Sequence, residues 1–371
     1  MLTVNTNKPY KIFAEHLEQG ALDQFESAMN QDFVTRGALM PDSHQGYSLP
    51  IGAVVETDGV IVPAWVGYDI GCGMCAIRTS FCCQEVQLNS QKIFEEIYKK
   101  IPVGFSHNAK PSEWNYSYLD VSDTTAKIFA KNGLNQLCSL GGGNHFIEIG
   151  YDEDWCVWII IHSGSRGIGH AVASHYMRIA SGDGKAREGH FGLSTDSQDG
   201  IDYIKDLAFC LSFALENRTQ MIGRIIDSIS AHVKFNGCDY LNLINRNHNH
   251  AELRDGKWIH RKGATHAELG MMGVIPGNMR DGSFIVRGKG NEESLYSSSH
   301  GAGRVLGRKE AQRVLNMDDF EKSMVGITAK VCAETLDESA FAYKDIFDVM
   351  RLQYDLVEVV AHVKPIINIK G

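Results

Sequence analysis

The stretch GYDIGCGMC, residues 67–75, places a carboxylate and a thiol three positions apart among glycines. Asp69 and Cys72 are separated by about one turn of chain, so both side chains can face the same ligand. The flanking glycines let the backbone bend tightly and approach whatever is held there. Two alternatives stay open for this motif: an inert cysteine in a tight turn, and a redox C-x-x-C formed by Cys72 and Cys75.

Several histidines stand at the ends of predicted strands. Asn144 and His145 follow three glycines in LGGGNHFIEI, and His162 follows the apolar run WCVWIII. His248 lies in the polar stretch NRNHNHAEL. Carboxylate oxygen, cysteine sulfur and imidazole nitrogen together suit a borderline divalent ion such as Mn, Co or Zn, whereas Mg and Ca prefer oxygen throughout. The residue types therefore predict a metal site, although their spacing does not name the metal.

The motif SSSHGAGR places His300 among small residues and before a helix-like segment. Small neighbours leave an imidazole accessible, and a helix start offers backbone N–H groups to a phosphate. The imidazole has three possible roles: metal ligand, general base or nucleophile. Attack on a phosphoryl group would give a covalent phosphoramidate.

The elements that must position these residues predict an α+β fold. Short strands and glycines alternate up to about residue 80, and residues 85–100 have the spacing of an amphipathic helix. The apolar run at residues 155–161 is typical of a strand buried on both faces. Residues 201–230 have the apolar spacing of one long helix or two helices in sequence.

No repeat or proline-rich linker divides the chain. We therefore expect one compact mixed α/β domain over residues 1–371, with metal ligands at strand ends. Residues 181–200 are rich in Gly, Ser, Asp and Lys without an apolar period, which predicts a mobile loop.

The composition is that of an ordinary soluble protein, with 43% apolar and 22% charged residues among 371. No signal peptide or membrane span is recognised, and nine cysteines without a secretion signal predict reduced thiols and a cytoplasmic location. The net charge of −9 argues against a charge-driven nucleic-acid binder. Residues 254–309 nevertheless hold ten Lys/Arg against five Asp/Glu, which indicates either a solvated basic face or a polyanion site.

From about Met40 to Gly371 the chain resembles the RtcB family of RNA ligases. Eight motifs occur in the family's order: MPDSHQGYSLPIGAVV, GYDIGCGM, LGGGNHFIEI, IHSGSRGIGH, HRKGAT, SSSHGAGR, AYKDI and the terminal KG. The resemblance implies an RNA ligase that uses GTP and two Mn²⁺ ions. Such an enzyme joins RNA ends with a 3′-phosphate or 2′,3′-cyclic phosphate to 5′-hydroxyl ends, in RNA repair or tRNA splicing. The need for an activating protein partner stays open.

The resemblance also implies a role for each matching residue. His300 would take GMP from GTP and pass it to the RNA 3′-phosphate. One metal would be bound by Asp69 and His145, the other by His162 and His248, and both by the Cys72 thiolate. Asn144 would contact the GTP phosphates. The remaining nucleotide contacts would come from Glu148, Asn278, Ala302, Gly303, Arg304, Tyr343 and Lys370. The basic excess at residues 254–309 adds Arg261 and Lys262 as candidate contacts to RNA phosphates, and Arg166 of the HSGSRGIGH loop is expected to face the RNA end.

Some features depart from the family. The chain is short for it, and Asn278 stands where a serine usually contacts the base, although an amide can also donate and accept hydrogen bonds. These changes suggest a divergent branch that prefers a particular structured RNA break over tRNA halves. Two rival functions remain: a Mn-dependent RNA phosphodiesterase or phosphatase that does not ligate, and a non-catalytic binder of damaged RNA.

Overall fold

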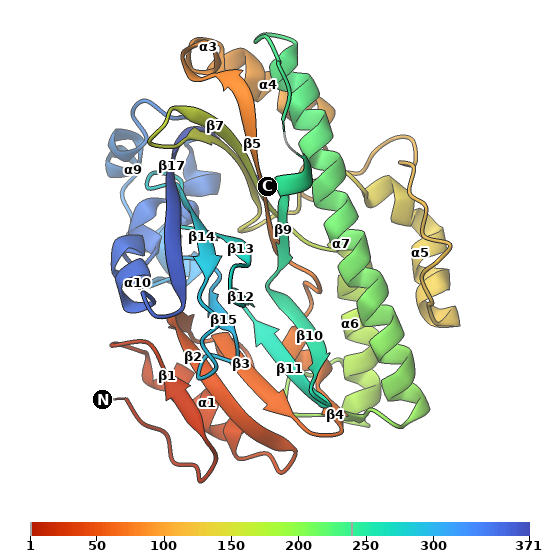
Figure 1. Ribbon diagram of the computed structural model, residues 1–371. Coiled ribbons are helices and arrows are strands. Elements are labelled where there is room, and N and C mark those ends of the chain that lie inside the picture. The colour runs from red at the N-terminus through yellow and green to blue at the C-terminus, as the bar shows by residue number, and fades with distance from the viewer. Residues whose placement is uncertain (1, 239) are drawn as a thin grey trace.

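The computed structural model describes residues 2–238 and 240–371, and it places two sheets between two groups of helices (Figure 1). The first sheet has the order β1-β2-β3-β11-β10, with bounds Tyr10–Ile12, Val34–His44, Ile51–Thr57, Lys257–Lys262 and Asn249–Arg254. The second has the order β13-β14-β17-β6-β7-β5-β9, with bounds Met272–Pro276, Ser283–Gly288, Val357–Lys370, Phe146–Tyr151, Cys156–Ser163, Gly73–Cys82 and Ile244–Asn247. Neighbouring strands pair antiparallel except for β1 with β2, and for β16 (Thr328–Ala329), which pairs parallel to β17. Two short pairs complete the strands: β4 (Val60–Ile61) with β8 (Leu193–Ser194), and β12 (Ala264–His266) with β15 (Ser297–Ser299).

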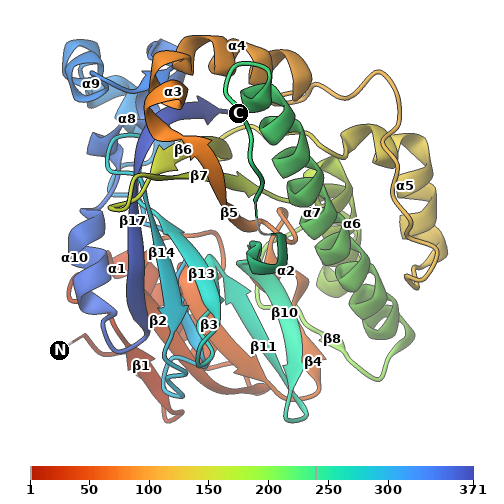
Figure 2. The ribbon, with the colours of Figure 1, turned by 45° about the horizontal axis from the view of Figure 1, so that its top comes forward.

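Helices cover the sheets on opposite sides, as two views agree (Figures 1 and 2). On one side lie α5 (Asp123–Gln136), α6 (Arg166–Ser181) and α7 (Gln198–Ser230). On the other side lie α8 (Arg308–Val314), α9 (Met317–Ser323) and α10 (Ile346–Leu352). The remaining helices are α1 (Gln19–Met29), α2 (Pro63–Val66), α3 (Cys83–Leu88) and α4 (Ser90–Lys100), with short 3₁₀ turns at Tyr240–Asn242, Ala333–Glu338 and Ala340–Ala342. The predicted α+β class is confirmed.

Strand β7 contributes to two cores, which explains its unbroken apolar run. Ile159 and Ile161 pack in a core with α4 and α7, while Trp158 and Ile160 face a second core with β13 and β14. Because successive side chains of a strand point to opposite faces, a strand covered on both sides must be apolar at every position. Full burial of each isoleucine contributes roughly 1.5–3 kcal/mol.

The predicted helical segment at residues 201–230 forms one helix. The hydroxyl of Ser197 caps α7 by accepting a hydrogen bond from the backbone N–H of Gly200 at 3.1 Å. The segment 85–100 instead divides into α3 and α4, which meet at Asn89.

The segment predicted to be a mobile loop, residues 181–200, connects α6 to α7 and contains β8. Its mobility stays a prediction. Among the described residues, no helix is both long enough and apolar enough to cross a bilayer.

Candidate active site

Four strand ends of the second sheet meet at one edge. The start of β6 lies opposite the end of β7, and the start of β5 lies opposite the ends of both β7 and β9. Cys72, His145 and His248 each lie one residue outside these strands, and His162 is the last residue but one of β7. Antiparallel pairing therefore delivers these side chains to one place, and their predicted position at strand ends is confirmed.

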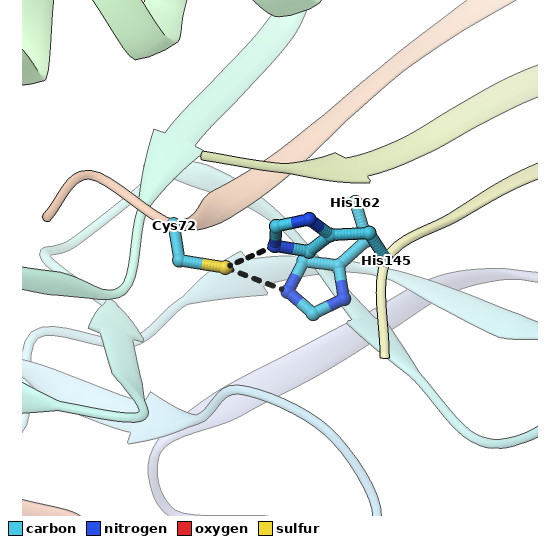
Figure 3. Close-up of side chains that lie close together, drawn as sticks. All are labelled: Cys72, His145 and His162. Atoms are coloured by element: carbon cyan, nitrogen blue, oxygen red, sulfur yellow. Dashed lines mark hydrogen bonds between the residues drawn. The ribbon is translucent and has the colours of Figure 1, made fainter. Parts of the chain in front are cut away.

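The Cys72 thiol is shared between two histidines (Figure 3). Its Sγ lies 3.2 Å from His145 Nε2 and 3.1 Å from His162 Nε2. His145 Nε2 also lies 2.9 Å from Asp69 Oδ2, and His162 Nε2 lies 3.1 Å from His248 Nε2. The five residues predicted as metal ligands thus form one continuous group.

The donor atoms of this group fit divalent transition metals. Nδ1 of His162 lies 3.1 Å from the carbonyl oxygen of Asn144, so Nδ1 carries the proton and Nε2 presents its lone pair to the group. The Nε2 atoms of His162 and His248 face each other at 3.1 Å, where two lone pairs repel unless a proton or cation lies near both. Sulfur and imidazole ligands favour borderline ions over Mg²⁺ and Ca²⁺.

Burial holds these histidines in the neutral form that binds metals. Desolvation lowers the pKa of His162 and of His248 well below the usual value. Burial, reinforced by the Asp69 carboxylate, raises the pKa of the Cys72 thiol. The thiol therefore keeps its proton until a cation balances the thiolate charge, so metal binding at Cys72 releases a proton.

A buried arginine of α7 connects three of the ligand loops. Arg218 has no exposed surface, and its Nη1 donates to the carbonyl oxygens of Gly71 at 2.9 Å and Ser163 at 2.7 Å. Its Nη2 donates to Asn247 Oδ1 at 2.7 Å. Each of these three acceptor residues is the immediate sequence neighbour of a predicted metal ligand. Sequence analysis missed Arg218, because nothing in an amphipathic helix marks one cation as buried.

His300 lies beside the ligand group and is oriented by a carboxylate. Its Nδ1 lies 2.7 Å from Asp42 Oδ2, and its ring centroid is 4.8 Å from that of His248. The same Asp42 oxygen accepts from the backbone N–H groups of His300 and Gly301 at 3.1 Å and 3.3 Å. Burial by itself would raise the pKa of Asp42, but the His300 imidazole outweighs burial and lowers it. The carboxylate therefore fixes a proton on Nδ1 and leaves the Nε2 lone pair of His300 free.

One cavity joins the ligand group to the predicted nucleotide residues. Its lining includes Asp69, Cys72, His162, His248 and His300. It also includes every residue predicted to contact the nucleotide: Asn144, Glu148, Asn278, Ala302, Gly303, Arg304, Tyr343 and Lys370. Further lining residues have no role predicted from the sequence, among them His44, Phe146, Asn249, Gly263 and Asn368.

A buried carboxylate organises two of the nucleotide residues. Glu338 Oε2 accepts from Lys370 Nζ at 2.7 Å and from the Tyr343 hydroxyl at 2.8 Å. Burial alone would raise the pKa of Glu338, but Lys370 and a neighbouring arginine outweigh burial and lower it to about 2. Glu338 is therefore charged at neutral pH and holds both side chains in place.

Two arginines surround the same carboxylate. Arg308 Nη1 lies 2.7 Å from Glu338 Oε1 and 2.6 Å from Asp337 Oδ2, and Arg304 Nη1 lies 3.3 Å from Glu338 Oε1. Together with Lys370, the two arginines place three cations beside the two carboxylates of Asp337 and Glu338. The resulting net positive charge suits a phosphate-bearing ligand.

Strands β6 and β17 present alternate side chains to the cavity. Phe146 pairs with Lys370, and Glu148 pairs with Asn368, in the antiparallel register. Glu148 is 1% exposed, and burial raises the pKa of its carboxyl group to about 7. Its Oε1 is buried without a hydrogen-bond partner among the described residues. Such an acceptor fits the N–H donors of a nucleobase.

Asn278 lines the cavity, but its amide serves a local turn. Its Oδ1 accepts from the backbone N–H groups of Arg280 and Asp281, each at 3.0 Å, and its Nδ2 donates to Asp281 Oδ2 at 2.8 Å. Base contact through this amide would require exchange of these bonds.

All three residues predicted to contact RNA are bonded within the protein. Arg166 Nε donates to Ser139 Oγ at 3.1 Å. Lys262 Nζ donates to the carbonyl oxygen of Ala64 at 3.0 Å and lies 3.3 Å from Glu188 Oε2. Neither side chain lines the cavity, and their contact with RNA stays a prediction.

The third, Arg261, belongs to a separate buried cluster. Its Nη1 lies 3.1 Å from His250 Nε2 and 2.5 Å from Glu252 Oε1, and its Nε donates to Ser297 Oγ at 2.8 Å. His250, Glu252 and His266 each offer a ligand atom within 4.8 Å of the others, but the guanidinium already supplies the positive charge there. The Arg261 side chain has no exposed surface, so contact with RNA would require a rearrangement, and it stays a prediction. The cluster instead anchors β15, which ends one residue before His300.

The helix-like segment predicted after Gly-Ala-Gly-Arg is α8, which begins at Arg308, eight residues after His300. In the loop that follows β7, Gly164 makes room for the Asp69 carboxylate. A Cβ at this position would lie 2.2 Å from Asp69 Oδ1.

Comparisons with known proteins place the chain in one family. The family model described as "tRNA-splicing ligase RtcB" matches residues 24–129 and 119–371. The chain is 35% identical to RNA-splicing ligase RtcB1 and 34% identical to RNA-splicing ligase RtcB, both from Escherichia coli, over 100% of this chain and 99% of each relative. It is also 30% identical to the tRNA-splicing ligase RtcB of Nanoarchaeum equitans, over 93% of this chain and 90% of that protein.

Proposed function

Since the chain belongs to the RtcB family, we propose that it is an RNA ligase that uses GTP and two Mn²⁺ ions. It joins RNA ends bearing a 3′-phosphate or 2′,3′-cyclic phosphate to 5′-hydroxyl ends, in RNA repair or tRNA splicing in the cytoplasm. Residues 1–371 act as one catalytic domain. The observation that carries this proposal is the oriented His300 imidazole, which shares a cavity with the metal-ligand group and the nucleotide residues.

His300 begins the reaction. Its Nε2 attacks the α-phosphorus of GTP, a P–N bond forms, and the bond to pyrophosphate breaks. Asp42 keeps the proton on Nδ1 and stabilises the positive charge that develops on the imidazole. An oxygen of the RNA 3′-phosphate then attacks the same phosphorus, which releases His300 and leaves GMP on the RNA. The 5′-hydroxyl oxygen finally attacks the RNA 3′-phosphorus, and GMP departs.

The metals would be bound by the group around Cys72. Asp69 and His145 would hold one ion, His162 and His248 would hold the other, and the Cys72 thiolate would contribute charge to both. Bound divalent ions neutralise charge on the reacting phosphoryl oxygens. Support comes from the Nε2 lone pairs of His162 and His248, which converge at 3.1 Å.

The nucleotide would occupy the remaining cavity. Glu148 accepts from the guanine edge, with Tyr343 and Lys370 beside the base, while Ala302 and Gly303 lie along the ribose. Asn144 and Arg304 contact phosphates. The support is that each of these side chains lines the same cavity.

A Mn-dependent phosphodiesterase is the rival function. It would use the metal group and would give His300 no covalent role. The cavity that His300 shares with Glu148 and Lys370 favours the ligase, because a hydrolase needs no guanine pocket. A non-catalytic binder would tolerate loss of metal ligands, and all five predicted ligands are present.

Incubation with Mn²⁺, GTP and two labelled RNAs tests the proposal. One RNA carries a 3′-phosphate, and the other carries a 5′-hydroxyl. A joined product that requires both GTP and Mn²⁺ is expected, and Cys72→Ser should abolish it. Loss of the 3′-phosphate without joining would favour a phosphatase, cleavage of either RNA would favour a phosphodiesterase, and unchanged RNAs would favour the binder.

A further inference from the structure

Asn368 of β17 is a cavity residue with an unused hydrogen-bond acceptor. It is 2% exposed, and its Oδ1 is buried without a partner among the residues that the structure describes. It pairs directly with Glu148 across β6 and β17, so both side chains leave the same face of the sheet. Both line the cavity.

The contact between these two residues fixes the orientation of the amide. Nδ2 of Asn368 lies 3.4 Å from Glu148 Oε2, and only the NH₂ group can donate to a carboxylate. The Asn368 oxygen therefore faces away from that carboxylate oxygen. Glu148 Oε1 is also buried without a partner in the described part of the chain. Two neighbouring buried acceptors in one cavity point to a ligand edge with several N–H donors, because buried acceptors are otherwise costly.

We propose that Asn368 is a specificity-determining residue for guanine, accepting a hydrogen bond from the 2-amino group while Glu148 accepts from N1–H and from the other 2-amino hydrogen. This inference rests on the proposed use of GTP. The three N–H donors of guanine meet three acceptor oxygens on two paired side chains. Hypoxanthine lacks the 2-amino donors, and adenine has no donor at N1 or C2. Asn368 thus contributes to selection for guanine at the 2-amino group, which hypoxanthine and adenine lack.

Measurements with three nucleotides distinguish a direct contact between Asn368 and the base from a merely structural role. The rate of covalent labelling of His300 is measured with α-labelled GTP, ITP and N²-methyl-GTP. Asn368→Ala is compared with the wild type and with Lys364→Ala, an exposed residue of the same strand. The variant should lower kcat/KM for GTP about two- to tenfold, the effect of one hydrogen bond, and leave ITP unchanged. It should also improve the use of N²-methyl-GTP, because the shorter side chain makes room for the methyl group.

Other outcomes of these measurements would contradict the inference. A matching loss with GTP and ITP would show that Asn368 acts only by supporting Glu148, and unchanged rates with all three nucleotides would remove any role for Asn368. The wild-type protein gives a second test if the variant does not fold, since equal use of GTP and N²-methyl-GTP would overturn the inference. Absence of any label in the wild type with GTP or ITP would contradict the proposed function itself.

Discussion

Nδ1 of His300 and Oδ2 of Asp42 lie 2.7 Å apart, although 258 residues separate them in the chain. Asp42 comes from β2 of the first sheet, and His300 directly follows β15. The carboxylate accepts three hydrogen bonds from the His300–Gly301 segment, so the imidazole and its backbone are fixed together. A nucleophile held with its free nitrogen already oriented reacts without reorganisation.

Asp42→Asn should slow the covalent labelling of His300 by GTP about 10²-fold or more. The amide oxygen can keep the hydrogen bonds of the carboxylate, but it lacks the charge that stabilises the imidazolium. The measurement is the rate of label transfer from α-labelled GTP at saturating Mn²⁺. Asp154→Asn, at an exposed carboxylate, serves as the control. Wild-type rates in folded Asp42→Asn would show that the charge has no part in the step.

Arg218→Met should weaken both folding and metal binding. Removal of the guanidinium leaves buried carbonyl and amide oxygens without donors, which costs about 2–4 kcal/mol of unfolding free energy. Mn²⁺ affinity should fall roughly 10- to 100-fold, since the ligand loops lose their common support. Urea unfolding and Mn²⁺ titration measure the two effects, with exposed Arg178→Met as the control. Lower stability with unchanged metal affinity would limit Arg218 to a folding role.

Guanosine binding should weaken below about pH 7. Burial raises the pKa of Glu148 to about 7, and guanine N–H groups bind the carboxylate form. Affinity is therefore full above this pKa and falls up to tenfold per pH unit below it, because a proton must leave before the base binds. Guanosine is the suitable probe, since it has no phosphate that titrates. The dependence should disappear in Glu148→Gln, and a wild-type affinity that does not change with pH would contradict the base contact.

Cys72→Ser should reduce the number of Mn²⁺ ions bound per chain from two, because a hydroxyl does not replace a bridging thiolate. Cys75→Ser is the matched control, since Cys75 is equally buried three residues away and lies outside the ligand group. Metal analysis after dialysis gives the stoichiometry. Equal loss of bound Mn²⁺ in the Cys72→Ser and Cys75→Ser variants would instead support the redox C-x-x-C interpretation.

The metal-ligand group could be predicted from the sequence because its information is local. Each ligand has a chemically distinctive side chain beside a glycine or a strand boundary. Antiparallel pairing then needs only the correct strand order to bring Cys72 and the three histidines to one edge. The apolar run of β7 was equally informative, since burial on both faces dictates its composition.

The supporting residues could not be predicted in this way. Asp42, Arg218 and Asn368 act through partners that are distant in the chain, and their own neighbours in sequence carry no sign of the contact. The role of the basic excess at residues 254–309 could not be decided from the sequence for a related reason. Carboxylates from other segments pair with its cations, as Asp58 does with Lys257 and Glu358 with Arg287.

In the proposed mechanism, His300 becomes covalently bonded to GMP. The protein is incubated with Mn²⁺ and α-labelled GTP, and a denaturing gel is run beside His300→Ala. We expect a labelled band in the wild type alone, stable to alkali and lost in acid, as a phosphoramidate should be. An unlabelled wild-type protein with both metals bound would rule out this intermediate and favour the phosphodiesterase.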